Sequence, residues 1–361
     1  MKRITALVLL LSILTGCTRL SAGEYLSIRP HEETAPQTAE TDAVVVEDYL
    51  GLRTAVKNFV RTGQTEGVIR VNSYEGDVEA DLTEVVYEVS KTDPFGAYAV
   101  EYMTHECVRI VSYYEIRIHT TFRRSLQELE AVEITVSQKQ LEERLERAME
   151  QGEELLLLQM NDYQNQDLAD MIQTFCVEHP DVVMETPAME VQMYPQNGRQ
   201  RILEVRLTYT LPWETLQQRR TAVQETVDGA AEYIRYREKP MDKAQLLYTY
   251  LITRFSYTQQ ETVTPVYSAL CEGAADPLGL AQGWKLICDK AGVECYVVQG
   301  LRNGQPYTWN IFSLDGEYRH VDLAQCVLER GGLILRTDKN MGEYHWDTSL
   351  YPACEIQAAG E

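Results

Sequence analysis

Apolar positions recur at helical spacing in two stretches of the chain that lie 89 residues apart, the separation of Leu52 and Leu141. A side chain at every fourth position falls on one helix face, so each stretch predicts an amphipathic helix. The two apolar faces are Leu52, Val56, Val60 and Leu141, Leu145, Met149. The same offset then aligns two short apolar runs, 68–71 and 157–160, which are typical of buried strands.

The 89-residue offset extends through a second helix and two more strands. Ala80-Asp81-Leu82 aligns with Ala169-Asp170-Met171, inside the second predicted helix of each stretch. Residues 115–118 and 204–207 both alternate between polar and apolar, as half-exposed strands do. We therefore predict a duplicated α/β module within residues 46–236. Its units span about 47–122 and 136–211, and each runs helix–strand–helix–strand–strand. Chance similarity between two α/β stretches is the alternative.

The N-terminal residues have the features of an export signal. Two basic residues precede an apolar run from Ile4 to Leu14, too short for a membrane-spanning helix of ~20 residues but suited to a signal peptide. The run ends in Leu-Thr-Gly-Cys at 14–17, which resembles the lipobox of bacterial lipoproteins. The resemblance implies removal of residues 1–16 and lipidation of Cys17. We expect a protein anchored to the outer, extracytoplasmic face of the bacterial cell membrane. The alternative is an ordinary signal peptide with an incidental cysteine.

Composition narrows the classes of partner. Residues 17–45 contain prolines and little apolar periodicity, which predicts a flexible tether. Asp and Glu number 55 against 33 Lys and Arg, a net charge of −22, so nucleic-acid binding is not expected. The eight cysteines include no C-x-x-C pair, which argues against a structural zinc site, and we expect no metal or cofactor. Lipidation of Cys17 would leave seven cysteines, whose pairing stays open.

Four sequence blocks follow one another in the last third of the chain. They are Leu270-Cys271-Glu272-Gly273, Asp289-Lys290-Ala291-Gly292-Val293-Glu294-Cys295, Tyr307-Thr308-Trp309-Asn310 and His320-Val321-Asp322. In order and spacing they resemble the bacterial transglutaminase-like superfamily over roughly residues 240–356. The resemblance implies a transglutaminase-like (papain-like) domain at 240–361 and an α+β fold. It also implies a Cys–His–Asp site, in which a thiolate attacks an amide carbonyl.

The chain departs from that family at two of the three catalytic positions. Alignment without gaps places Pro277 at the nucleophile, Tyr307 at the general base and Asp322 at the retained carboxylate. Proline offers no nucleophile, and a phenol with a pKa of ~10 is a poor base near neutrality. Asp276 and Pro277 instead suit an N-cap and the first helical position. We therefore expect a pseudoenzyme rather than an enzyme.

The sequence supports three hypotheses for function. The first is a lipoprotein that binds an extracytoplasmic protein or a cell-wall peptide, with Trp284, Tyr307 and Trp309 lining a groove. The second is an active thiol peptidase or acyltransferase that uses a displaced cysteine, Cys271. His320 could then stand in as the base, although a structural role for it fits better. The third is a structural or assembly subunit.

Overall fold

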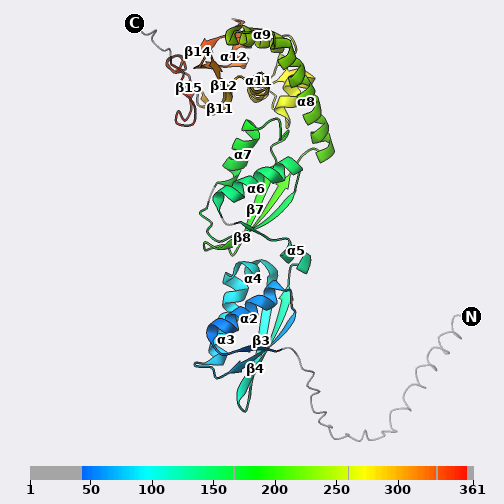
Figure 1. Cartoon of the computed structure of the whole chain (residues 1–361), viewed down its shortest axis with the longest axis vertical. Coiled ribbons are helices and arrows are strands. Elements are labelled where there is room, and N and C mark those ends of the chain that lie inside the picture. The colour runs from blue at the N-terminus through cyan, green and yellow to red at the C-terminus, as the bar shows by residue number, and fades with distance from the viewer. Residues whose placement is uncertain (1–42, 136, 166, 259, 331, 356–361) are drawn as a thin grey trace, which may run out of the picture. The chain divides into compact units, whose positions relative to one another are not determined.

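The computed structural model describes residues 43–355 except 136, 166, 259 and 331 (Figure 1). The predicted signal peptide (1–16), the predicted lipidation site Cys17 and nearly all of the predicted tether (17–45) therefore lie outside the described residues. From Val44 onward the chain forms one compact unit of mixed α+β structure. In this described part, no helix is both long and apolar enough to cross a membrane.

The first sheet has the strand order β1-β2-β4-β3. Its strands are β1 (Val44–Val46), β2 (Glu66–Asn72), β3 (Val100–Ile110) and β4 (Tyr113–Phe122). Three helices accompany it, α2 (Tyr49–Arg61), α3 (Val78–Tyr87) and α4 (Pro94–Ala99), with a π-helical turn at Glu88–Thr92. Asp48 caps α2 and Asp77 caps α3 by accepting backbone N–H groups. The predicted helix face of α2 is buried in the core of this unit.

The second sheet has the corresponding order β5-β6-β8-β7. Its strands are β5 (Glu133–Thr135), β6 (Leu155–Met160), β7 (Ala188–Tyr194) and β8 (Arg201–Thr208). Helix α5 (Leu126–Glu130) precedes the sheet, and α6 (Gln138–Gln151) and α7 (Leu168–Glu178) pack on it. In both sheets the first strand pairs in parallel with the second and the other pairs are antiparallel.

The strand registers of the two sheets agree in part with the 89-residue offset. Val44 pairs with Ile69 and Glu133 with Leu158, so this offset holds for the first pair of strands. In the last strand of each unit, Ile116 pairs with Ile69 and Leu203 pairs with Leu158. The structurally equivalent positions of β4 and β8 are therefore two residues closer in sequence than the 89-residue offset. Side chains alternate with a period of two, so this displacement keeps the same face buried. The short strands β1 and β5 are absent from the sequence prediction, because three residues carry no readable alternation.

The remaining residues form a third group of elements around a five-stranded antiparallel sheet of order β14-β13-β12-β11-β15. The strands are β11 (Cys295–Arg302), β12 (Gln305–Leu314), β13 (Glu317–Val321), β14 (Leu335–Arg336) and β15 (Tyr344–His345). The helices are α8 (Trp213–Ile234), α9 (Pro240–Ile252), α10 (Pro265–Tyr267), α11 (Pro277–Lys290) and α12 (Leu323–Glu329). The other elements are a two-stranded parallel pair, β9 (Ser256–Tyr257) with β10 (Ala274–Ala275), a π-helical turn at Ser268–Glu272 and a 3₁₀ turn at Asp338–Asn340.

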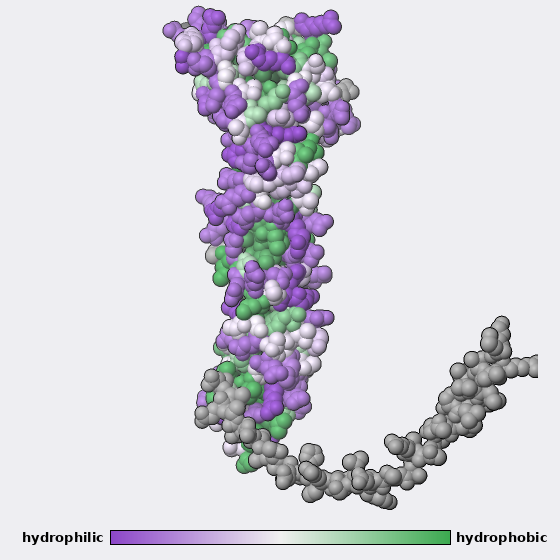
Figure 2. All heavy atoms as spheres, turned by 90° about the vertical axis from the view of Figure 1, so that its right-hand side faces the viewer, coloured by the Kyte–Doolittle hydropathy of each residue, from purple (hydrophilic) through white to green (hydrophobic). Residues whose placement is uncertain are grey.

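Helix α11 is fixed on strand β12 by a buried aromatic pair and a buried amide. Trp284 is fully buried and meets the ring of Phe312 edge-on, with centroids 5.4 Å apart. Asn310 donates its side-chain N–H groups to the carbonyls of Ala281, at 2.9 Å, and Tyr296, at 3.1 Å. These contacts hold the middle of α11 in place against the sheet. The face of the molecule drawn in Figure 2 is largely hydrophilic, as expected when most apolar residues lie in such cores.

Candidate functional site

The three positions that align with the catalytic residues of the transglutaminase-like family lie at one end of α11. Pro277 is the first residue of α11, Tyr307 lies on β12, and Asp322 follows β13 and caps α12. A cavity of about 670 Å³ opens here, and Pro277 and Tyr307 both line it. The sequence alignment therefore identified residues that the fold brings to one cavity.

Asp322 is held by three donors. Tyr307 donates its hydroxyl to Oδ1 at 3.3 Å, and Tyr344 donates to Oδ2 at 2.7 Å. The backbone N–H of Gln325 donates to Oδ1 at 3.0 Å. Burial raises the pKa of the Asp322 carboxyl, and the hydrogen bonds from these donors partly oppose that rise. The carboxylate thus orients two phenols, where the family has one imidazole.

Tyr307 is a hydrogen-bond donor at this site and not a base. Burial raises the pKa of its phenol well above the ordinary value, and the negative charge of Asp322 raises it further. A phenol that stays protonated cannot accept a proton from a nucleophile near neutral pH. Tyr307 therefore contacts Asp322 as the general base of the family would, but its phenol does not act as a base.

The start of α11 is built as a helix terminus. Asp276 accepts the backbone N–H of Gly279 at 2.7 Å, and Pro277 fits the first helical position because no N–H is needed there. Burial raises the pKa of the Asp276 carboxyl. Among the residues that line the cavity, in the described part of the chain, there is no cysteine, histidine, lysine or arginine. The charged groups in the lining are Glu261 and Asp276, both acidic.

Cys271, the candidate displaced nucleophile, lies outside this lining. It belongs to the π-helical turn before β10, and its Sγ lies 3.6 Å from the hydroxyl of Thr226 on α8. Burial is the largest cause of a rise in the pKa of its thiol. A catalytic thiol requires a lowered pKa and a base in contact with it. The position of Cys271 offers neither feature.

The structure corrects the predicted aromatic groove. Of the three aromatic residues assigned to it, Tyr307 lines the cavity, but Trp284 and Trp309 are 0% and 1% exposed and belong to the core. Trp284 lies between α11 and the sheet. Trp309 lies under the C-terminal tail (residues 338–355), where its ring meets those of Tyr344 and Trp346. Aromatic character in the sequence does not show which rings the tail covers.

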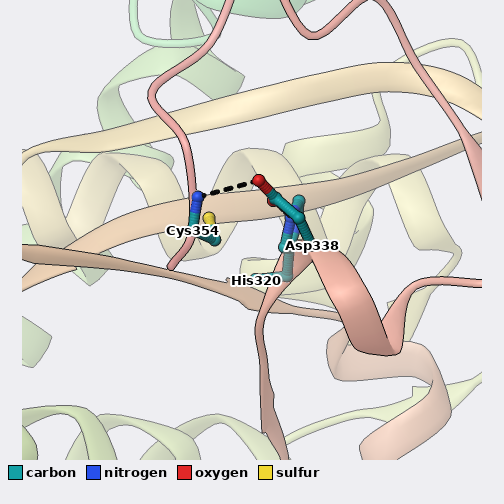
Figure 3. Close-up of side chains that lie close together, drawn as sticks. All are labelled: His320, Asp338 and Cys354. Carbon is teal, nitrogen blue, oxygen red and sulfur yellow. Dashed lines mark hydrogen bonds and ion pairs between the residues drawn. The ribbon is translucent and has the colours of Figure 1, made fainter. Parts of the chain in front are cut away.

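Where the tail meets β13, His320 lies close to two tail residues, the half-buried Asp338 and the buried Cys354 (Figure 3). His320 Nε2 lies 2.8 Å from Asp338 Oδ1, and the backbone N–H of Cys354 donates to Asp338 Oδ2 at 3.2 Å. Trp309 donates its indole N–H to His320 Nδ1 at 3.0 Å. Because Nδ1 is an acceptor, the proton of the neutral ring lies on Nε2 and points to Asp338.

This tautomer decides what the cluster can do. The three candidate ligand atoms lie within 4.8 Å of one another, but Nε2 carries a proton where a metal would need its lone pair. Burial raises the pKa of the Cys354 thiol to about 12, which disfavours the thiolate. Both nitrogens of His320 are engaged, so it does not replace Tyr307 as a base. The geometry is that of a clasp that fixes the C-terminal tail.

Sequence reasoning missed Tyr344. Its hydroxyl makes the shorter of the two phenol contacts with Asp322, yet it comes from β15, at the far edge of the sheet. No local motif links residues 322 and 344, since the tail must first fold over Trp309 to bring them together. The Asp322–Tyr344 contact was therefore not accessible from spacing.

No family model matches this chain, and no curated protein matches it. Two solved structures show a weak similarity. One is described as a TGase, with 12% identity over 54% of this chain and 59% of that chain, at a TM-score of 0.27. The other is a candidate protease from Parabacteroides distasonis, with 10% identity over 72% of this chain and 43% of that chain, at a TM-score of 0.24. This chain thus spans about three fifths and two fifths of their lengths, and TM-scores this low carry no argument about fold or function.

Proposed function

We propose that this protein is a lipid-anchored extracytoplasmic binding protein with a transglutaminase-like domain that no longer performs catalysis. The observation that carries the proposal is the cavity of about 670 Å³ at the start of α11. Pro277 and Tyr307 line it at the positions where the family has its nucleophile and its base. A cavity that remains after these groups are lost is better suited to binding than to chemistry.

The absence of a cysteine and a histidine from the described lining is what disfavours catalysis of the kind that this family performs. Acyl transfer through a covalent intermediate needs a nucleophile, and a neighbouring base to activate it. Asp322 could orient such a base, but its partners here are two protonated phenols. The domain therefore acts by binding.

The chemistry of the lining favours a peptide as ligand. Gln299 and Thr308 line the cavity, and their side-chain amide and hydroxyl groups are of the kind that exchange hydrogen bonds with a peptide backbone. Glu261 and Asp276 add acidic groups, and no basic side chain of the described lining balances them. A neutral or positively charged peptide segment, from an extracytoplasmic protein or from the cell wall, suits this environment.

The two four-stranded sheets complete the proposed architecture. Their shared strand order and strand directions support descent from one duplicated α/β module, as the 89-residue sequence match predicts. Among the described residues of the two units we identify no candidate catalytic constellation. We assign them to the non-catalytic, extracytoplasmic part of the lipoprotein.

Lipid anchoring can be tested separately from binding. Cells producing the full chain are labelled with radioactive palmitate, and the membrane fraction is compared with that of a Cys17→Ser variant. We expect label and membrane association in the parent protein and loss of both in the variant. Unlabelled parent protein would refute lipid anchoring and would leave the proposal of ligand binding in the cavity untouched.

Binding is tested by photo-crosslinking in cells. A photoreactive phenylalanine analogue replaces Thr308 in the cavity lining or, as a matched control, the exposed Asp315 in the β12–β13 turn of the same domain. We expect a discrete crosslinked adduct from position 308 that is missing from position 315, and mass spectrometry of the adduct identifies the peptide. Identical products from both positions would contradict a binding role for the cavity.

The same adduct distinguishes binding from catalysis. The identified peptide is synthesised with a glutamine side chain and incubated with the lipid-free protein. Release of ammonia, or transfer of the acyl group to an added amine, would overturn the non-catalytic assignment. We expect the peptide to be recovered unchanged.

A further inference from the structure

Two cysteine side chains lie next to each other in the core of the third group of elements. Cys288 is on α11 and Cys295 is the first residue of β11. Cys288 lies one helical turn after Trp284, whose ring contacts Phe312. Phe312 is the strand partner of Cys295, so both cysteines lie where α11 packs on the sheet, and both are free thiols in the structure. Each residue is 3% exposed, and both belong to the same apolar cluster. Two thiols that meet in a core are the starting geometry for a disulfide, which needs Cβ atoms ~3.5–4.5 Å apart.

The backbone between the two cysteines is a tight and well-defined turn. The N–H of Val293 donates to the carbonyl of Cys288 at 2.8 Å, and Gly292 adopts a left-handed conformation with φ of 72°. Only glycine takes up this conformation without strain, so the chain reverses here and enters β11 directly. The turn thus brings the end of α11 back to the first residue of β11.

A third side chain fixes the position of the Cys295 sulfur. Asn310 donates to Cys295 Sγ at 3.6 Å, and the same amide is held by the carbonyls of Ala281 and Tyr296. Three of the other five cysteines of the described residues contact other groups. Cys176 contacts the Met149 sulfur, Cys271 the Thr226 hydroxyl, and Cys326 the backbone of Ile334. The pair 288–295 differs from these three because both of its members lie where α11 packs on the sheet.

Burial determines when such a bond can form. Exchange between a thiol and a disulfide requires a thiolate that the oxidant can reach. With α11 packed, Cys288 is inaccessible, and burial raises the pKa of its thiol well above the ordinary value. The oxidation therefore belongs to the folding of the chain, before α11 closes over β11.

We propose that Cys288 and Cys295 form a structural disulfide when the chain folds outside the cytoplasm. The oxidant is a disulfide, either of a thiol–disulfide oxidoreductase or of a small molecule. The two cysteines lose two protons and two electrons and form one S–S bond, and the oxidant's S–S bond takes up both and becomes two thiols. The inference rests on the proposed extracytoplasmic location, since disulfides persist in oxidising compartments.

The sequence around the pair allows an unambiguous test. Protein from the membrane fraction is blocked with N-ethylmaleimide and digested with trypsin without reduction. Cleavage after Lys285, Lys290 and Arg302 releases residues 286–290 and 291–302, each with a single cysteine. We expect these two peptides as one linked species, ~2 Da lighter than their sum, which separates on reduction. Blocked, unlinked peptides would overturn the disulfide.

The palmitate label of the same sample separates this inference from the proposed location. Labelled membrane protein with unlinked 286–290 and 291–302 leaves the anchor intact and refutes the disulfide. If the protein carries no label, unfolded chain is refolded with oxidised glutathione and mapped in the same way. The linked species then supports the pairing, and its absence refutes it.

Stability measurements provide an independent arm. We expect dithiothreitol to lower the urea midpoint of the parent protein and of a Cys326→Ser variant, whose altered cysteine is also buried. A variant with serine at both 288 and 295 should show no shift with dithiothreitol. An equal shift in this double variant would contradict the assignment. If the double variant does not fold, the peptide map of the parent protein decides.

Discussion

Replacing His320 with leucine tests the clasp that holds the C-terminal tail. The variant removes the acceptor of the Trp309 indole N–H and the donor to Asp338. An unsatisfied buried donor costs about 1–3 kcal/mol, and Trp309 is 1% exposed. Asp338 keeps its bond from the Cys354 backbone and is partly exposed, so its loss is about 1 kcal/mol. We expect a destabilisation of about 2–4 kcal/mol.

Tryptophan fluorescence is a specific assay for this change. All four tryptophans lie at or after residue 213, outside the two four-stranded sheets, so their emission follows the third group of elements. Urea unfolding of the lipid-free mature chain then gives the change in midpoint. His345→Leu is the matched control, because this side chain is exposed on the same tail, and it should shift stability by less than about 0.5 kcal/mol. A His320→Leu variant as stable as the control would refute the clasp.

The same variant predicts a change in pH dependence. Burial lowers the pKa of His320 below its usual value, so the folded protein keeps the ring neutral where the unfolded chain binds a proton. This contribution to stability is therefore present above pH ~6.5 and is lost as the pH falls below it. Burial raises the pKa values of Asp276 and Asp322, which act with the opposite sign in both proteins. The difference between parent and variant thus isolates His320, and equal pH slopes would contradict its neutral buried state.

Three further predictions concern the cavity and the tail. Alkylation of Cys271, followed by peptide mass spectrometry across pH 5–10, should show an apparent pKa above the ~8.5 of a free thiol, and a lower value would favour a thiol enzyme. Gly300→Ala places a methyl group 2.5 Å from a tail carbonyl oxygen, so we expect a loss of about 1–3 kcal/mol and faster proteolysis of the tail, whereas Gly342→Ala, with open space around it, should be near neutral. The double variant Pro277→Cys, Tyr307→His should give a thiol with a lowered pKa, and a normal pKa would show that the α11 terminus and residue 307 do not cooperate.

The sequence predicted the elements that repeat over many residues. The helix face of Leu52, Val56 and Val60 is confirmed by its burial in α2, since a face that recurs over more than two helical turns averages over local exceptions. The three-residue strands β1 and β5 lie below the length at which alternation can be recognised. They form because β2 and β6 offer free backbone groups for pairing. This depends on tertiary contacts and not on the local sequence.

The candidate site, too, was predictable from the sequence only in part. The order and spacing of the four sequence blocks predicted that Pro277 and Tyr307 lie close together, and both line one cavity. This succeeds because the segments between the blocks have lengths compatible with one fold. The roles of Trp284 and Trp309 were assigned wrongly, because burial by the tail or by α11 depends on contacts between distant segments. The Asp322–Tyr344 and His320–Asp338 contacts have the same long-range origin.

The start of α11 also determines which ligands the cavity disfavours. The N-terminus of a helix usually offers several free N–H groups, and these attract phosphate or carboxylate. Here residue 277 is a proline without such a group, and Asp276 accepts the N–H of Gly279 with its side chain and that of Leu280 with its carbonyl. An anion entering the cavity would find these two donors occupied and a buried carboxyl beside them. The helix end therefore rejects negatively charged ligands through the same residues that stabilise it.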